Sequence, residues 1–125
     1  MELSEAIDEL MASPAVTDVA GRAEHIRALV TPDFIFVDPE FVAAGAKGAA
    51  DAFGWHRATG EVVRTSAVEV NHGNFFYSWA RRDDGEIVAE GYDFGSADRA
   101  GRIRRIVSFL VPVPDPRSAP VRHVA

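Results

Sequence analysis

The second half of the chain consists of four β-favouring segments separated by short turns that contain glycine and an acidic or amide residue. The segments are Glu61–Val70, Asn74–Arg82, Glu86–Ser96 and Arg102–Pro112. The turns are Asn71-His72-Gly73, Asp83-Asp84-Gly85 and Asp98-Arg99-Ala100-Gly101. Tight hairpins need residues that accept positive φ, which Asn, Asp and Gly do readily. Because such short loops make successive strands antiparallel neighbours, the sequence predicts a four-stranded meander.

The first third of the chain has the apolar spacing of helices instead. Two amphipathic helices are predicted, the first capped by Ser4 and the second by Asp18. Their apolar positions are Leu3, Ile7, Leu10 and Met11 in the first helix, and Ala23, Ile26, Leu29 and Val30 in the second. Pro14 interrupts the first helix, and Thr31-Pro32-Asp33 is expected to end the second.

A short strand and a third helix are predicted between these helices and the meander. The strand covers Phe34–Val37 and stops at Asp38-Pro39, because proline has no N–H to donate to a neighbouring strand. The third helix begins near Ala49 and ends within residues 57–60. The order of elements predicts one α+β domain over residues 1–111. Residues 112–125 are rich in proline and are expected to form an extended, mobile tail.

Composition excludes several classes of function. The 125 residues suit a single domain, and the net charge of −6 argues against nucleic acid as a partner. The chain has no cysteine, which excludes disulfides and thiolate metal sites and fits the cytoplasm. The N-terminus is acidic without a signal-peptide core, and no apolar run approaches the roughly 20 residues that span a membrane. We therefore expect a cytoplasmic protein with no nucleic-acid or membrane partner.

One face of the segment Glu86–Ser96 carries small residues around a single carboxylate. That face contains Ile87, Ala89, Gly91, Asp93 and Gly95. Phe75, Tyr77 and Trp79 share a face of the preceding segment, an aromatic wall that is more typical of a core than of a pocket. A buried carboxylate is costly unless it is paired, neutral or hydrated. Asp93 is therefore either a structural hydrogen-bonding group or a pocket acid, and we favour the pocket.

The order of helices, short strand and meander resembles the cone-shaped fold of nuclear transport factor 2 (NTF2). Relatives of that protein include ketosteroid isomerases, SnoaL-like polyketide cyclases and limonene epoxide hydrolases. The residues that carry the resemblance are Phe36-Val37-Asp38-Pro39, Gly48, His72-Gly73-Asn74, Trp79, Gly91-Tyr92-Asp93, Gly101-Arg102-Ile103 and Phe109. The resemblance implies N-terminal helices packed on a curved, mainly antiparallel sheet around a hydrophobic pocket. It implies a fold more than a reaction, because this fold hosts many functions.

Within this superfamily, the placement of two aspartates resembles that of ketosteroid isomerases. Asp38 matches the position of their general base, and Asp93 matches the protonated aspartic acid of their oxyanion hole. The tyrosine of that hole has no counterpart, because residues 11–15 contain no aromatic side chain. His56 falls near the place of a supporting tyrosine. The resemblance thus implies a cofactor-independent isomerase or cyclase that transfers protons on a hydrophobic carbonyl compound.

Other interpretations of the same residues remain open. An aspartate before proline often caps its own turn, so Asp38 is equally a candidate for a purely structural role. Epoxide opening is not expected, since Gly91 stands where limonene epoxide hydrolases have arginine. The candidate pocket residues besides the two aspartates are Phe36, His56, Phe75, Tyr77, Trp79, Gly91 and Ser108. The four histidines lack metal-ligand spacing, so no metal and no cofactor are expected.

The missing tyrosine leaves a second function open, a non-catalytic ligand-binding or dimerisation domain. Either function implies a small hydrophobic molecule or a second copy of the chain as partner. Homodimerisation is expected from the resemblance and from the apolar residues on the outer face of the sheet. These residues are Val88, Tyr92, Phe94 and Phe109.

Overall fold

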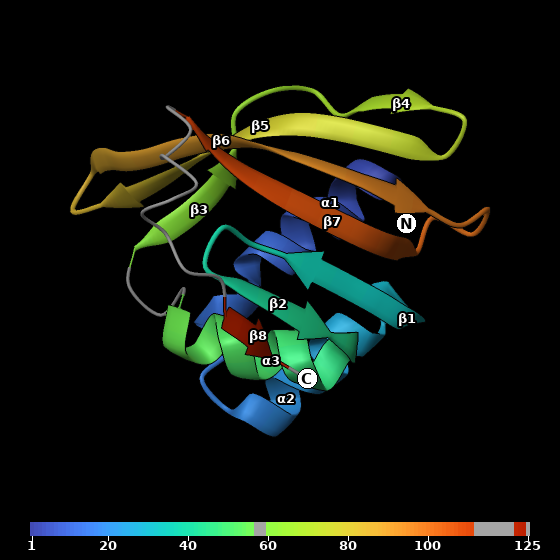
Figure 1. Ribbon diagram of the computed structural model, residues 1–125, viewed down its shortest axis with the longest axis horizontal. Coiled ribbons are helices and arrows are strands. Elements are labelled where there is room, and N and C mark those ends of the chain that lie inside the picture. Colours follow the sequence, from blue (N-terminus) through green and yellow to red (C-terminus); the bar gives the residue numbers. More distant parts are fainter. Residues whose placement is uncertain (57–59, 112–121, 125) are drawn as a thin grey trace.

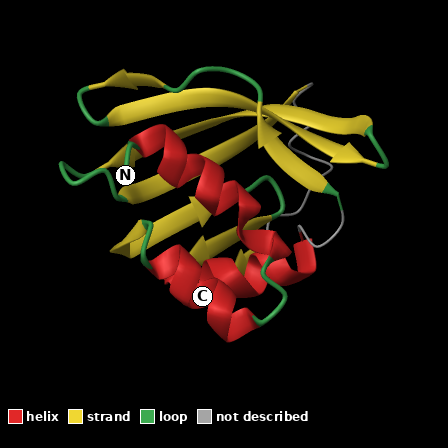
Figure 2. Ribbon diagram, turned by 180° about the vertical axis from the view of Figure 1, so that it is seen from behind, coloured by secondary structure: helices red, strands yellow, loops and turns green. Residues whose placement is uncertain are grey.

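The computed structural model describes residues 1–56, 60–111 and 122–124. Its helices lie on one side of a strongly curved sheet, as two opposite views show (Figure 1 and Figure 2). The helices are α1 (Leu3–Ala12), the short 3-10 helix η1 (Ser13–Ala15), α2 (Val19–Arg27) and α3 (Gly45–His56). The predicted α+β class is confirmed. None of these helices is long and apolar enough to cross a membrane.

The eight strands form a single sheet. They are β1 (Val30–Val37), β2 (Phe41–Ala44), β3 (Glu61–Arg64), β4 (Glu69–Asn71), β5 (Asn74–Asp83), β6 (Glu86–Ala97), β7 (Ile103–Val111) and β8 (Arg122–Val124). Their order is β3-β5-β6-β7-β1-β2-β8, with β4 also paired to β5. The pairs β1–β7 and β2–β8 are parallel, and the other pairs are antiparallel. β8 lies within the predicted tail, whose other residues fall outside the described part of the chain.

The predicted hairpins are confirmed by their backbone angles. His72 and Gly73 between β4 and β5 have φ of 52° and 78°, and Asp84 and Gly85 between β5 and β6 have φ of 50° and 80°. Two successive residues with positive φ are the signature of the type I′ turn, whose twist matches that of antiparallel strands. Residues 61–70, predicted as one strand, form two, because β3 and β4 pair with successive parts of β5.

The helix caps agree with the prediction at one helix and not at the other. Asp18 caps α2 as predicted, since its Oδ2 accepts a hydrogen bond from the Gly21 N–H at 2.9 Å. The predicted cap of α1 is wrong, because Ser4 lies inside that helix. Glu2 precedes α1 and makes no side-chain cap.

The boundary between α2 and β1 also differs from the prediction. Val30, expected in the helix, begins β1 and pairs with Ile103 of β7, whose N–H donates to the Leu29 carbonyl at 2.9 Å. This strand pairing overrides the helical spacing. Pro32 fits inside β1 because the register between β1 and β7 shifts between Val30 and Ile35, where a missing N–H breaks no regular ladder.

A buried aromatic cluster fills the space between β1, β2 and α3. The Phe36 ring packs against Phe53 at 5.1 Å and against Phe41 at 5.8 Å between ring centroids, and Phe34 lies beside it. All four rings are almost completely shielded from solvent. The four rings therefore occupy the part of the interior that β1, β2 and α3 enclose.

The side chain of Arg22 connects α2 to its neighbouring helices through hydrogen bonds. It is buried, and its guanidinium donates to the Ala50 carbonyl at 2.9 Å and to the Val16 carbonyl at 2.5 Å. These bonds link α2 to α3 and to the end of η1.

Replacing Arg22 by Met is expected to lower the free energy of unfolding by about 2–3 kcal/mol, because it leaves one buried and one partly buried carbonyl group without their charged donor. The matched control is Arg27→Met on the exposed side of the same helix, which is expected to change stability by less than about 0.5 kcal/mol. Urea unfolding of both variants measures the difference. Equal stabilities of the two variants would contradict this role of Arg22.

Candidate functional site

A pocket of about 250 Å³ opens at one end of the inner sheet face, between β5, β6, β7 and the loop after β1. It is lined by Asp38, Pro39, Glu40, Val62, Trp79, Arg81, Val88, Ala89 and Leu110. We call this space the mouth pocket. Its wall is mainly apolar, and its charged groups come from the β1–β2 loop and from Arg81.

Asp38 caps its own turn and also lines the mouth pocket. Its Oδ1 accepts a hydrogen bond from the Glu40 N–H at 3.0 Å, and its own N–H donates to the Phe41 carbonyl at 2.8 Å, so it does cap its turn. Its side chain is nevertheless only 6% exposed and lines the mouth pocket. The turn therefore holds the carboxylate in place at the pocket wall.

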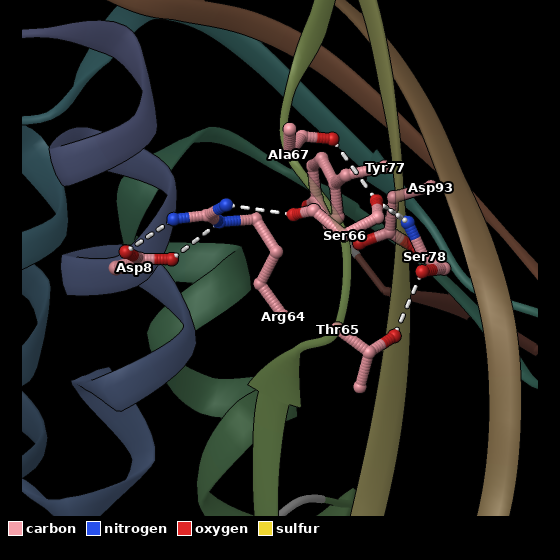
Figure 3. A network of polar contacts seen from close by, with 8 residues as sticks. All are labelled: Asp8, Arg64, Thr65, Ser66, Ala67, Tyr77, Ser78 and Asp93. Atoms are coloured by element: carbon pink, nitrogen blue, oxygen red, sulfur yellow. Dashed lines mark hydrogen bonds and ion pairs between the residues drawn. The ribbon is translucent and has the colours of Figure 1, made fainter.

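Tyr77, Asp93 and Ser108 form a row across β5, β6 and β7. Asp93 is the direct cross-strand partner of Tyr77 on one side and of Ser108 on the other. The Tyr77 hydroxyl donates to Asp93 Oδ2 at 2.6 Å, and Figure 3 shows these two side chains meeting. Asp93 is 1% exposed. The carboxyl group is thus fixed in the interior by a tyrosine that the sequence placed on the same face.

The register brings Asp38 towards this row. Val37, the last residue of β1, pairs with Val107 of β7, and Asp38 and Ser108 each follow directly in these two parallel strands. Asp38 and Asp93 therefore lie two strand spacings apart, about 10 Å between backbones. Among the described residues, the lining of the mouth pocket includes Asp38 and Trp79 but not Asp93, which lies deeper.

Trp79 borders the mouth pocket and is the next inward-facing residue of β5 after Tyr77, the partner of Asp93. Its ring lies directly over Gly91, where a Cβ would come within 2.5 Å of the indole carbons. Gly95 gives the Phe75 ring the same room, with 2.6 Å between that ring and a Cβ at Gly95. The space that the small residues of β6 provide is thus occupied by two aromatic rings of β5.

The other candidate pocket residues lie in different environments. Phe36 belongs to the aromatic cluster of the core, and Phe75 stacks on Tyr77 with 6.1 Å between ring centroids. The side chain of His56 lies outside the described part of the structure. Arg81, which sequence reasoning missed, lines the mouth pocket. Its signal was available, because Arg81 continues the alternation of Phe75, Tyr77 and Trp79 along β5.

A larger cavity of about 770 Å³ lies between α1, η1 and β3. Arg64 crosses its wall and donates from Nε and Nη2 to the two carboxylate oxygens of Asp8 at 2.8 and 2.9 Å (Figure 3). This side-chain hydrogen bond raises the pKa of the Arg64 guanidinium. Nη1 donates to the Ser66 carbonyl at 2.7 Å. No periodic signal could predict this pair, since its members lie far apart in the sequence.

Replacing Tyr77 by Phe is expected to lower the free energy of unfolding by about 2 kcal/mol. The change removes the hydroxyl that donates to the buried Asp93 Oδ2 and leaves the ring in place. Tyr92→Phe is a matched control, because Tyr92 lies on the outer face of β6 and is half exposed. Chemical denaturation should separate the two variants by more than about 1 kcal/mol. If both lost the same small amount, Tyr77 would not hold Asp93 in place.

Comparison with known proteins gives structural relatives only. No family model and no curated protein sequence matches the chain. A candidate isomerase of the SnoaL-like family from Agrobacterium tumefaciens superposes with a TM-score of 0.74 at 23% identity, covering 86% of this chain and 93% of that one. An NTF2-like protein of unknown function from Cytophaga hutchinsonii gives 0.61 at 9% identity, covering 94% and 93%. A candidate polyketide cyclase from Sinorhizobium meliloti gives 0.59 at 14% identity, covering 83% and 93%.

These similarities extend over nearly the whole length of both chains, and their identities are too low to transfer an activity. They agree with the curved sheet, the helices on one side and the order of elements described above. The chain therefore has the NTF2-like fold, the fold of SnoaL-like proteins.

Proposed function

We propose that this protein binds a small hydrophobic carbonyl compound in the mouth pocket and transfers a proton at the carbon next to the carbonyl. The observation that carries the proposal is the position of Asp38, a buried carboxylate that faces an apolar-walled pocket beside Trp79. A carboxylate held in such a place is suited to act as a general base. The names of two structural relatives, an isomerase and a polyketide cyclase, are compatible with this chemistry.

The proposed step uses the chain's own residues. The Asp38 carboxylate accepts the proton, the electrons of the broken C–H bond form a C=C bond, and the carbonyl π electrons move onto oxygen. Asp93, in its neutral form, donates a hydrogen bond to that oxygen. Tyr77 acts as its positioning residue through the bond to Oδ2. Asp38 then returns the proton to the same carbon or to a neighbouring one.

The size of the pocket limits the ligand. A volume of about 250 Å³ lies just below the roughly 300–1,000 Å³ of typical ligand sites. We infer a monocyclic compound, or a larger one of which only the reacting end enters the mouth pocket. A fused four-ring molecule would have to extend out between Arg81 and the β1–β2 loop.

Hydrogen exchange of a simple ketone tests this function without knowledge of the natural substrate. Cyclohexanone is incubated with the protein in D₂O, and loss of its α-proton signal is followed by NMR. The protein is expected to accelerate exchange well above the buffer rate, and serum albumin at the same concentration is the control for non-specific basic groups. A rate no higher than that with albumin would refute proton abstraction.

The outer face of the sheet favours a second candidate function, dimerisation. Phe76, Tyr92, Phe94 and Phe109 are each close to half exposed there, whereas Val88, also expected on this face, lines the mouth pocket. The Phe94 ring contacts Phe76 at 5.6 Å and Phe109 at 5.8 Å between centroids, forming a continuous apolar surface over β5, β6 and β7. Exposed patches of this kind mark interaction sites. We propose a second copy of the chain as the partner, and dimerisation is compatible with either a catalytic or a non-catalytic role.

Replacing Phe94 by Lys is expected to convert the dimer into a monomer, because it places a charge in the middle of the apolar surface. Val70→Lys is the control. Val70 is exposed, but it pairs with Phe75 across the strands and therefore shares the inner face with Phe75, away from the Phe94 surface. Sedimentation equilibrium at micromolar concentration measures the change. A wild-type chain that sediments as a monomer would refute dimerisation.

A further inference from the structure

Two polar side chains in the interior lack the hydrogen bond that buried polar groups normally make. Trp79 Nε1 and Ser108 Oγ are completely shielded, and neither has a hydrogen-bond partner among the residues that the structure describes. Other buried hydroxyl groups of the chain are bonded, for example Ser13 Oγ, which donates to the Leu10 carbonyl at 2.7 Å. An unmet buried donor costs about 1–3 kcal/mol. Unsatisfied buried groups at two neighbouring positions require an explanation, and a ligand that completes the site would supply one.

The two groups converge on the seam between β6 and β7. The Trp79 ring reaches across Gly91, and its Cε2, the carbon bonded to Nε1, lies 2.7 Å from the place of a Gly91 Cβ. Gly91 pairs with Leu110, and the next inward-facing pair along the same strands is Asp93 with Ser108. Ser108 is therefore the diagonal neighbour of Gly91, about 7 Å away between backbones. The indole N–H and the serine hydroxyl thus approach one region of the seam.

This region lies between the mouth pocket and the proposed acid. Trp79 lines the mouth pocket, and Ser108 pairs with Asp93 across the β6–β7 ladder. The seam therefore lies deeper than the mouth pocket, whose described lining includes Trp79 and not Ser108. An indole N–H only donates, whereas a hydroxyl donates or accepts.

We propose that Trp79 Nε1–H and Ser108 Oγ–H both donate to one oxygen of the ligand and hold it beside Asp38. This inference rests on the proposed function. It assigns the binding of the oxygen to two residues outside the aspartate pair, and it specifies the ligand as a compound with an acceptor oxygen, such as a ketone or its enolate. Trp79 gains a second role as the wall against which the apolar part of the ligand packs.

A matched pair of probes tests the assignment. Cyclohexanone carries the acceptor oxygen, and methylenecyclohexane has a CH₂ group in its place. The chain has two tryptophans, so a ¹⁵N–¹H spectrum shows two indole signals, and Trp55→Phe identifies that of Trp79. Cyclohexanone is expected to move the Trp79 N–H signal downfield, the direction of a new hydrogen bond. Methylenecyclohexane is expected to cause no downfield shift.

Two variants distinguish the contribution of the hydrogen bonds to binding from the contribution of the shape of the site. Ser108→Ala is expected to weaken cyclohexanone binding about fivefold, the factor that corresponds to about 1 kcal/mol for one neutral hydrogen bond. Trp79→Phe keeps an aromatic ring and should weaken binding at least as much. Neither variant should weaken methylenecyclohexane binding to the same extent. Ser96→Ala on the outer face of β6 is the control, and circular dichroism establishes that each variant is folded.

The outcomes distinguish this proposal from the proposed function. A downfield Trp79 shift without any acceleration of α-proton exchange supports the two anchors and refutes the catalysis. Accelerated exchange that Ser108→Ala and Trp79→Phe leave unchanged refutes the anchors and supports the catalysis. Absence of a Trp79 shift up to the solubility limit of cyclohexanone overturns the assignment of the anchors.

Discussion

Gly91→Ala is expected to lower the free energy of unfolding by more than about 3 kcal/mol, the upper range for overpacked positions. A Cβ at this position would lie 2.5 Å from the Trp79 ring and closer still to the Phe109 carbonyl oxygen. Both distances are much shorter than a van der Waals contact. The carbonyl belongs to the neighbouring strand β7, so it cannot move away without opening the β6–β7 ladder. The ring can move only by giving up its place at the wall of the mouth pocket.

Urea unfolding gives the free energies of unfolding of Gly91→Ala and of its control, Glu90→Ala, which changes the preceding residue of the same strand. Glu90 is exposed on the outer face, and its replacement should change stability by less than about 0.5 kcal/mol. The same Gly91 variant should also lose the buried environment of Trp79, seen as a red shift in its fluorescence. A Gly91→Ala protein as stable as Glu90→Ala would show that the Trp79 ring does not rest on β6.

Asp38→Asn is expected to reduce protein-catalysed α-proton exchange of cyclohexanone by about 10²-fold or more, the usual contribution of a general base. The amide is nearly isosteric with the carboxylate but accepts a proton poorly. Its oxygen can still accept the hydrogen bond from the Glu40 N–H, so the turn after β1 should persist. Binding of the ketone should therefore change much less than the rate.

Asp84→Asn is the matched control for this substitution. Asp84 lies in the hairpin between β5 and β6 with φ of 50°, a conformation that asparagine also adopts readily. The Asp84→Asn variant should catalyse α-proton exchange of cyclohexanone at the same rate as the wild-type protein. A large loss of rate in Asp84→Asn would point to a general effect of charge and not to a base in the mouth pocket.

The meander could be predicted from the sequence because its signals are local. Asn or Asp followed by glycine fixes the hairpins, and the alternation of Phe75, Tyr77 and Trp79 places these residues on one face, where all three are buried. The wall was interpreted as core more readily than as pocket. It is both, since Phe75 and Tyr77 lie in the core and Trp79 borders the mouth pocket.

Features that depend on distant partners could not be predicted in this way. Val30 follows a helical spacing, and only its pairing with Ile103 makes it part of a strand. β2 was missed because its four residues, Phe41–Ala44, carry no period of their own and gain their strand structure from β1. The same holds for Gly91, whose role depends on a ring from another strand.

The sequence indicated which residues share the inner face but not how they are arranged on it. Asp38 and Trp79 do meet at one pocket, and Tyr77, Asp93 and Ser108 do share one row. The position of Trp79 opposite Gly91 could not be predicted, because it follows from the register of β5 against β6.

The role of Asp38 as the base of a proton-transfer site is tested by the ratio of the α-proton exchange rates of wild-type and Asp38→Asn protein. Each protein is saturated with cyclohexanone in D₂O, and exchange is followed by NMR. We expect a ratio of about 10² or more. A ratio near one, with both proteins folded and binding the ketone, would show that Asp38 is not the base.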